Sequence, residues 1–217
     1  MKKVIKIAFF CLTGLFFYMP LHSQFIGFMP MKDTAAYNAR MNDVSKKTNT
    51  IESDFVQKKV MSVLADEVIS KGHFIYKKPD RVCWEYTDPN KYLILISGEK
   101  IIIRNDKKQN EYDMKTSKAF QKVNRIMSGL MQGDIQNIKK DFKVEYFEND
   151  KLYLVNLVPK SVLMKQFFHN IEIYTDRESA MVGSIRINEP SGDYTLIEFL
   201  KRVVNTEVPD ERFNAEK

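Results

Sequence analysis

The sequence predicts a mainly β protein with helices, in which one large, strongly curved antiparallel sheet of about eleven strands is covered by helices on one face. Three observations favour this class. Short runs rich in β-branched and aromatic residues alternate polar and apolar positions, turn residues separate these runs, and helical spacing is confined to two main segments. No repeat or low-complexity linker divides the chain, so we expect residues 24–217 to form a single domain.

The first residues have the composition of a secretory signal. Three lysines within the first six residues precede an apolar run, Ile7–Met19, that is short for a membrane span. We expect a cleaved signal peptide over residues 1–23 and no stable membrane span afterwards; an uncleaved N-terminal anchor is the alternative. Cleavage lowers the formal charge from +6 to +3, because three lysines leave. Cys83 is then the single cysteine, so the domain depends on its core and not on a disulfide.

A helix is predicted over Thr34–Thr48, before the first strand. Tyr37, Met41 and Val44 recur at the spacing of one helix face, and Asp33 is a favourable residue for the N-cap. The sequence therefore begins its folded part with an amphipathic helix.

From Ile51 the apolar period changes to two, which predicts a β-meander. After the strand that begins there, five further runs have strand composition and lie between turns that contain Pro, Gly, Asn or Asp. Their expected bounds are Val68–Lys77, Arg81–Thr87, Lys91–Ser97, Lys100–Asn105 and Gln109–Met114.

A second helix, over Ser117–Gln132, is predicted to interrupt the meander. Phe120, Val123, Met127 and Leu130 share one face at helical spacing, and a further helical turn is expected directly afterwards. Strands then resume, with expected bounds Asp141–Glu148, Leu152–Pro159, Phe168–Thr175, Met181–Asn188 and Tyr194–Val204.

Several function classes leave no trace in the sequence. Basic residues are scattered along the chain, which argues against a nucleic-acid-binding face. The chain has no nucleophile elbow, phosphate-binding loop, dinucleotide fingerprint or zinc-spaced cysteine and histidine set. His73 and His169 fall in two different predicted strands, so we expect no metal site. We therefore expect no catalytic residues and no cofactor, and the protein is not expected to be an enzyme.

One predicted strand carries a row of large aromatic and aliphatic side chains. Because strand residues alternate between faces, Trp84 points one way and Cys83 points the other, where we expect an unreactive thiol. The preceding strand adds either Phe74 and Tyr76 or Ile75, depending on register. From the pattern alone, this row either fills an ordinary core or lines a hollow, and both interpretations stay open. The row consists of Val82, Trp84 and Tyr86.

The order and spacing of these motifs resemble one family. "DFVQKK" (Asp54–Lys59) and "GHFIYKKPDRVCWEYTDPNKYLILISGEKIIIRN" (Gly72–Asn105) look like the hallmark of the periplasmic outer-membrane lipoprotein carrier family, LolA. "LVPK" (Leu157–Lys160) resembles a strand end of the same family. The resemblance covers the first half of the mature chain well and the second half in the order of its elements.

The resemblance implies a half-open antiparallel β-barrel with an α-helical lid, Phe120–Met131, over an apolar cavity for the acyl chains of lipoproteins. The family takes lipoproteins from an ABC release complex in the inner membrane and passes them to an outer-membrane receptor, without a cofactor. A periplasmic monomer is therefore expected. Carriage of another lipid or acylated compound, or a periplasmic sensor or protein-interaction role, are the alternatives. The cavity is expected to be lined by Phe55, Phe74, Val82, Trp84, Tyr86, Ile94, Phe120, Val123, Met127, Leu130 and Met131.

The chain departs from the family at one position. Well-known members place an arginine directly before the proline that ends the second strand, and this arginine holds the lid closed. Here that position is Lys78. The resemblance assigns lid closure to Lys78, which is a point donor and not a planar fork.

Overall fold

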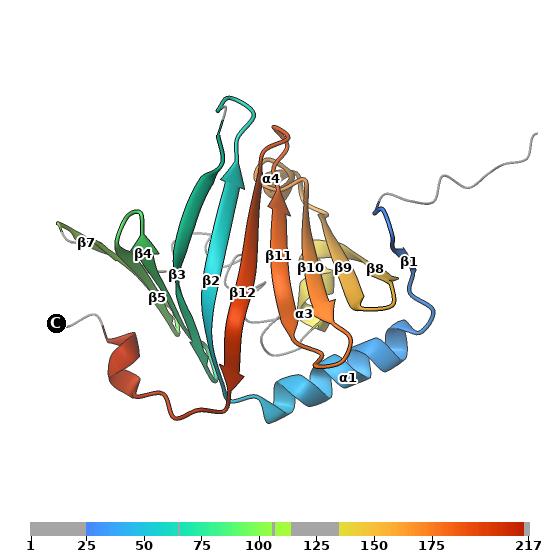
Figure 1. Ribbon diagram of the computed structural model, residues 1–217, viewed down its shortest axis with the longest axis horizontal. Helices are drawn as coiled ribbons and strands as arrows, with labels where there is room; N and C mark the ends of the chain where they lie inside the picture. Colours follow the sequence, from blue (N-terminus) through green and yellow to red (C-terminus); the bar gives the residue numbers. More distant parts are fainter. Residues whose placement is uncertain (1–24, 65, 106, 114–134, 215–217) are drawn as a thin grey trace, which may run out of the picture.

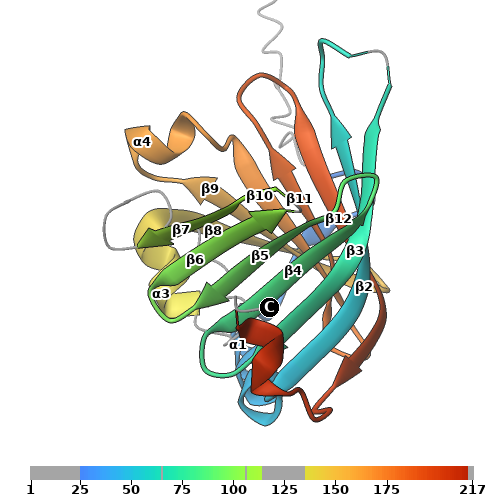
Figure 2. The same ribbon diagram turned by 90° about the vertical axis from the view of Figure 1, so that its left-hand side faces the viewer.

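The computed structural model describes residues 25–64, 66–105, 107–113 and 135–214, which contain one twelve-stranded antiparallel sheet (Figure 1). Its order is β1-β8-β9-β10-β11-β12-β2-β3-β4-β5-β6-β7, so β1 and β7 are its edges. The sheet curls until its two halves face each other without closing, as Figure 2 shows. The strands are β1 (Met29–Pro30), β2 (Thr50–Val60), β3 (Val68–Lys77), β4 (Arg81–Asp88), β5 (Tyr92–Ser97), β6 (Lys100–Asn105), β7 (Gln109–Asp113), β8 (Phe142–Glu148), β9 (Leu152–Pro159), β10 (Asn170–Asp176), β11 (Val182–Asn188) and β12 (Tyr194–Val204).

This architecture confirms the predicted class, a curved antiparallel sheet that forms a half-open barrel. The described part of the chain holds twelve strands where about eleven were expected, because β1 has only two residues and no period to detect. The helices are α1 (Thr34–Lys47), α3 (Ile135–Asp141), α4 (Val162–Lys165) and the 3₁₀ helix η2 (Asp210–Phe213). The predicted lid helix, Phe120–Met131, lies outside the described residues.

Helix α1 begins where the sequence predicts. The side chain of Asp33 accepts a hydrogen bond from the backbone N–H of Ala36 at 2.8 Å and caps the helix. Tyr37 is the large buried residue of α1, and its ring lies edge-on to those of Tyr146 and Tyr153, at centroid distances of 5.8 and 5.0 Å. The helix therefore packs its apolar stripe against the concave face of β8 and β9.

The concave face of the sheet is apolar from one side to the other. On β2 to β6 it carries a cluster of buried residues that includes Phe55, Phe74 and Trp84, and on β8 to β11 a second cluster that includes Val155 and Ile173. Phe199 on β12 packs against both clusters and joins them. Side chains of α1, α3 and α4 cover the second cluster, through Tyr37, Ile138 and Met164.

The chain's C-terminal part covers a separate patch on the convex face. After β12 it runs across the sheet, and Val208, together with Phe213 at the end of η2, packs on Ile75, Cys83 and Leu95, all of them buried. This contact forms a third, small core that sequence periodicity did not predict.

Candidate functional site

The register between β3 and β4 decides which side chains form the concave row. Phe74 pairs with Trp84 and Tyr76 with Val82, whereas Ile75 pairs with Cys83 on the opposite face. The register therefore selects Phe74 and Tyr76, of the two alternatives that the sequence left open. The rings of Phe74 and Trp84 lie 4.6 Å apart, and both also contact Phe199 on β12, at 5.4 and 5.9 Å.

Gly72 on β3 makes room for Phe55 in this row. It lies in register with Phe55 on β2 and with Tyr86 on β4. A Cβ at this glycine would come within 2.0 Å of the carbonyl oxygen of Glu85 and 2.8 Å of Phe55 Cζ. With no side chain in the way, the ring of Phe55 reaches over β3 and lies 5.0 Å from that of Tyr86 and 5.1 Å from that of Trp84.

The row ends at a polar contact. Tyr86 stacks on Tyr92 of β5 at a centroid distance of 4.1 Å, and its hydroxyl donates to Gln57 Oε1 at 2.9 Å. Burial, with the neighbouring Tyr92, raises the pKa of Tyr86 above its ordinary value. This buried hydroxyl is therefore satisfied by a partner within the protein.

The structure brings together every predicted cavity residue that it describes. Phe55, Phe74, Val82, Trp84 and Tyr86 are buried members of one cluster, and half-buried Ile94 packs against it. The other predicted lining residues lie outside the described part of the chain: Phe120, Val123, Met127, Leu130 and Met131.

A small apolar cavity of about 50 Å³ lies where α1 crosses this surface. Met41 and Val44 of α1 form one wall, and Phe74, Met181 and Phe199 form parts of the other. Sequence reasoning did not assign α1 to the site, although the stripe that contains Met41 and Val44 was visible. The remaining lining residues are Ser45, Thr48, Ile51, Ala180, Val182 and Arg202.

Lys78 forms hydrogen bonds with the C-terminal end of α1. Its Nζ donates to the carbonyl oxygens of Ser45 and Lys46, at 2.8 and 2.9 Å. These carbonyls belong to the last turn of the helix, where a cation is favoured by the helix dipole. Asn205 adds a third tie, because its Nδ2 donates to the carbonyl oxygen of Lys47 at 3.0 Å. In the described residues, Lys78 therefore fixes one helix that covers the concave face; any contact with residues 120–131 lies outside them.

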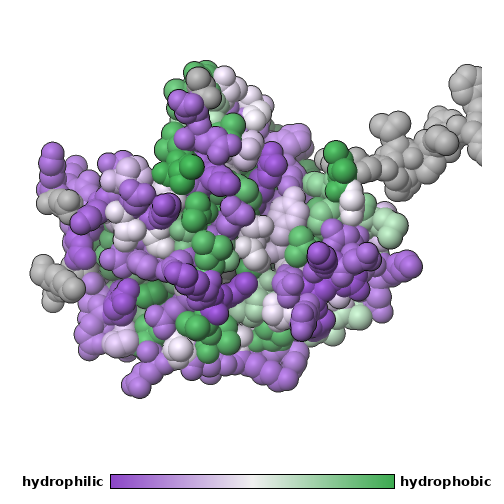
Figure 3. Space-filling model, viewed as in Figure 1, coloured by the Kyte–Doolittle hydropathy of each residue, from purple (hydrophilic) through white to green (hydrophobic). Residues whose placement is uncertain are grey.

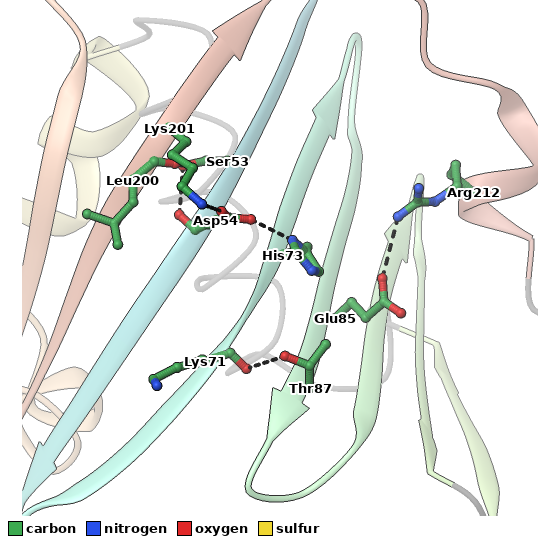
Figure 4. A network of polar contacts seen from close by, with 9 residues as sticks. All are labelled: Ser53, Asp54, Lys71, His73, Glu85, Thr87, Leu200, Lys201 and Arg212. Carbon is green, nitrogen blue, oxygen red and sulfur yellow. Dashed lines mark hydrogen bonds and ion pairs between the residues drawn. The ribbon is translucent and has the colours of Figure 1, made fainter.

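The convex face behind the aromatic row carries exposed ion pairs instead (Figure 4). Asp54 lies 2.7 Å from His73 Nδ1 and 3.3 Å from Lys201 Nζ, and the hydrogen bond from Lys201 lowers the pKa of this carboxyl. Arg212, near the C-terminal end, lies 3.4 Å from Glu85. These contacts join β12, β2, β3 and β4 to the C-terminal part, so we assign them a structural role.

Two further findings concern metal-binding groups and membrane spans among the described residues. Among the described residues, no group of three or more His, Cys, Asp or Glu side chains is placed to hold a metal ion. None of the helices described there is both long enough and apolar enough to cross a membrane.

Comparison with solved structures finds proteins that resemble this chain. MucB of Pseudomonas aeruginosa is 11% identical to this chain, with a TM-score of 0.51, and the match covers 86% of this chain and 64% of MucB. A DUF1329 family protein from Desulfovibrio piger is 13% identical, with a TM-score of 0.49 and coverage of 83% and 95%. A LolA superfamily protein from Nitrosomonas europaea is 10% identical, with a TM-score of 0.45 and coverage of 82% and 96%.

Comparison with curated proteins finds no match to this sequence. The family described as "Outer membrane lipoprotein carrier protein LolA" does match, over residues 46–216, which run from the end of α1 through η2. This range includes the aromatic row, Lys78 and all strands except β1. The resemblance seen in the motifs is therefore confirmed, and the chain belongs to the LolA family.

Proposed function

We propose that this protein is a periplasmic carrier that binds the acyl chains of lipoproteins on its concave face and moves them from the inner to the outer membrane. The observation that carries the proposal is the continuous apolar surface on the concave face from β2 to β6. Phe55, Phe74 and Trp84 pack together on this surface. Membership of the LolA family supports it. The predicted signal peptide supports export.

The free energy of hydrocarbon burial favours a carrier whose cavity is closed when no cargo is bound. Each buried CH₂ group contributes about 0.8 kcal/mol, so one long acyl chain offers on the order of 10 kcal/mol. Several chains would approach the practical ceiling of non-covalent affinity, and such a cargo could not be released. The free-energy cost of opening the carrier must therefore offset part of this gain.

The described cavity can hold an acyl chain only if the side chains that line it move. Its volume of about 50 Å³ falls far below the roughly 300–1,000 Å³ of ordinary ligand pockets. Met41 and Met181 line it from opposite sides, and methionine side chains repack at low cost. We infer that cargo enters by displacing these side chains and the predicted lid, in which Met127 and Met131 provide the same adaptability.

In this proposal Lys78 keeps α1 in place while the lid moves. Its two hydrogen bonds hold the last turn of α1 against the turn between β3 and β4, so the wall formed by Met41 and Val44 stays attached to the sheet. No catalytic residue or cofactor is required. The partners expected by resemblance are an inner-membrane ABC release complex and an outer-membrane receptor.

Mass spectrometry of the protein purified from its native periplasm tests the cargo. Acylated lipoprotein in stoichiometric amount is the expected result. Free lipid would replace the proposal by carriage of another lipid, and a stably bound protein without lipid would replace it by an interaction role. Depletion in the native cell gives an independent test, because lipoproteins that still reach the outer membrane in normal amounts would overturn the carrier role.

A matched pair of variants tests the predicted lid. Leu130→Asp places a charge on the apolar face of the predicted helix and should abolish retention of acylated cargo, with an unchanged far-ultraviolet circular dichroism spectrum. Gln121→Asp adds the same charge away from that face and should retain the cargo. Equal retention by both variants would show that this segment does not cover the hollow.

A further inference from the structure

The connection between β9 and β10 exposes three large apolar side chains on one short segment. Val162 is 77% exposed, Phe167 is 50% exposed and Leu163 is 42% exposed. Figure 2 shows α4 projecting from the sheet, on the side away from the β2–β3 turn. An apolar cluster held in water in this way indicates a contact surface, because exposed apolar residues that serve no contact are usually scattered singly.

The segment is held firmly, so the exposure does not come from fraying. Ser161 caps α4 by accepting a hydrogen bond from the backbone N–H of Met164 at 3.3 Å. Met164 is 2% exposed and anchors the helix in the core beside Ile138 and Phe142. The backbone N–H groups of Phe167 and Phe168 both donate to the carbonyl oxygen of Met164, at 3.0 and 2.9 Å. The fold thus buries one side of the segment and presents the other.

The charges around these side chains are positive. Residues 160–169 contain Lys160 and Lys165 and no acidic residue. Lys160 Nζ donates to the carbonyl oxygen of Lys139 at 2.6 Å, so Lys139 and Lys140 in the last turn of α3 lie beside the segment. Asp141, which ends α3, is the one acidic residue of that turn, and the lysines outnumber it. Exposed apolar side chains with several lysines nearby are the chemistry by which proteins bind an anionic lipid surface.

A second exposed apolar patch has the opposite charge and serves as a comparison. The β2–β3 turn exposes Val63 and Leu64, where Figure 3 shows apolar side chains at the surface, but Asp66 and Glu67 follow directly. Carboxylates at this position oppose contact with an anionic bilayer. The contrast favours a lipid surface for the α4 segment and not for the turn.

We propose that residues 160–169 dock this protein on anionic membrane surfaces, with Val162, Leu163 and Phe167 entering the headgroup region and the surrounding lysines contacting lipid phosphates. The inference concerns a surface outside the hollow, and it does not rest on the proposed cargo. It assigns to the α4 segment a reversible contact, since three side chains are far too few for stable insertion.

Co-sedimentation of the purified protein with lipid vesicles tests the docking. We expect binding to vesicles that contain phosphatidylglycerol, no binding to phosphatidylcholine alone, and weaker binding as salt increases. Val162→Ser with Phe167→Ser should weaken the binding at least about tenfold, and Lys165→Glu should weaken it severalfold. The matched variant Val63→Ser with Leu64→Ser should bind as the unchanged protein does.

Thermal melting of each variant checks that the fold persists. The amount of cargo that each variant retains is measured as well, and the α4 variants should retain it, because the docking surface lies outside the hollow. Unchanged vesicle binding by the α4 variants would overturn the proposal. An equal loss of vesicle binding in the variant that carries Val63→Ser and Leu64→Ser would also overturn it. So would an unchanged protein that does not bind vesicles, with α4 variants that lose binding to a protein partner instead.

Discussion

Phe55 lies over the backbone of Gly72 on the neighbouring strand, so closely that a Cβ on the glycine would come within 2.8 Å of the ring. The same Cβ would meet the carbonyl oxygen of Glu85 at 2.0 Å, which no side-chain adjustment can relieve. The centre of the concave surface thus depends on an absent side chain.

Gly72→Ala should lower the free energy of unfolding by about 2–4 kcal/mol, because β3 and β4 must separate to admit the methyl group. Urea denaturation measures the change. Gly183→Ala is the control, since a Cβ there would meet its nearest neighbour, the carbonyl oxygen of Tyr174, at an ordinary 3.8 Å. Equal stabilities of the two variants would contradict the packing described for Phe55.

Lys78→Met should loosen α1 at its C-terminal end. The change removes two charge-assisted hydrogen bonds to the carbonyls of Ser45 and Lys46, and we expect a loss of about 1–2 kcal/mol. Hydrogen exchange should accelerate in the last turn of α1 before it does so in the sheet. Lys78→Arg should keep most of the protection, and Lys46→Met, on the exposed side of the same turn, should keep all of it. Uniform exchange rates in all variants would refute the role of Lys78.

Trp84 is the single tryptophan and therefore reports on the concave face. A brominated fatty acid that enters the hollow should quench its fluorescence, because bromine quenches on contact and Trp84 lies among Phe55, Phe74 and Phe199. The unbrominated fatty acid controls for changes in conformation. Binding without quenching would place the ligand elsewhere on the protein.

Alkaline pH should destabilise the protein through Cys83. Burial raises the pKa of this thiol to about 11. Between its ordinary value and 11, the folded state keeps a proton that the unfolded state releases. The stabilisation is therefore complete below about pH 9 and is lost as the pH rises towards 11, by up to about 2–3 kcal/mol. Unfolding experiments at pH 7 and 10.5 should show a steeper loss in the natural protein than in Cys83→Ala, and parallel losses would contradict the assignment.

Phe213→Ser should expose the same thiol. Phe213 and Val208 cover Cys83 from the C-terminal part of the chain, and removal of the ring opens the small convex core. The reaction with a disulfide reagent at pH 8 should become at least about tenfold faster, while the concave cluster, on the other face of the sheet, remains intact. A reaction rate equal to that of the natural protein would show that η2 does not shield Cys83.

Strand bounds followed closely from the sequence because turn residues delimit most strands. β3, β6, β9 and β12 begin and end where the alternation and the flanking turns predict. The register did not follow, since the choice between Phe74 and Ile75 as the partner of Trp84 depends on pairing across strands. A period of two defines the faces of each strand, but not which faces of neighbouring strands coincide.

The features that the sequence did not predict belong to short elements or to segments without a regular apolar period. The strand expected from Phe168 begins at Asn170, because the preceding residues form α4 and the turn after it, and the strand expected from Asp141 begins one residue later, after α3. η2 has four residues, too few to show helical spacing. The role of α1 as a wall of the cavity was also missed, because Met41 and Val44 suit ordinary packing equally well.

The two edge strands have a consequence for solubility at high concentration. An open sheet offers unpaired backbone groups to neighbouring molecules, which is the usual route to fibrous aggregates. β1 is two residues long and ends in Pro30, which has no N–H to donate, and β7 carries Glu111 and Asp113. The described edges of this half-open sheet thus discourage self-pairing by brevity at β1 and by charged side chains at β7.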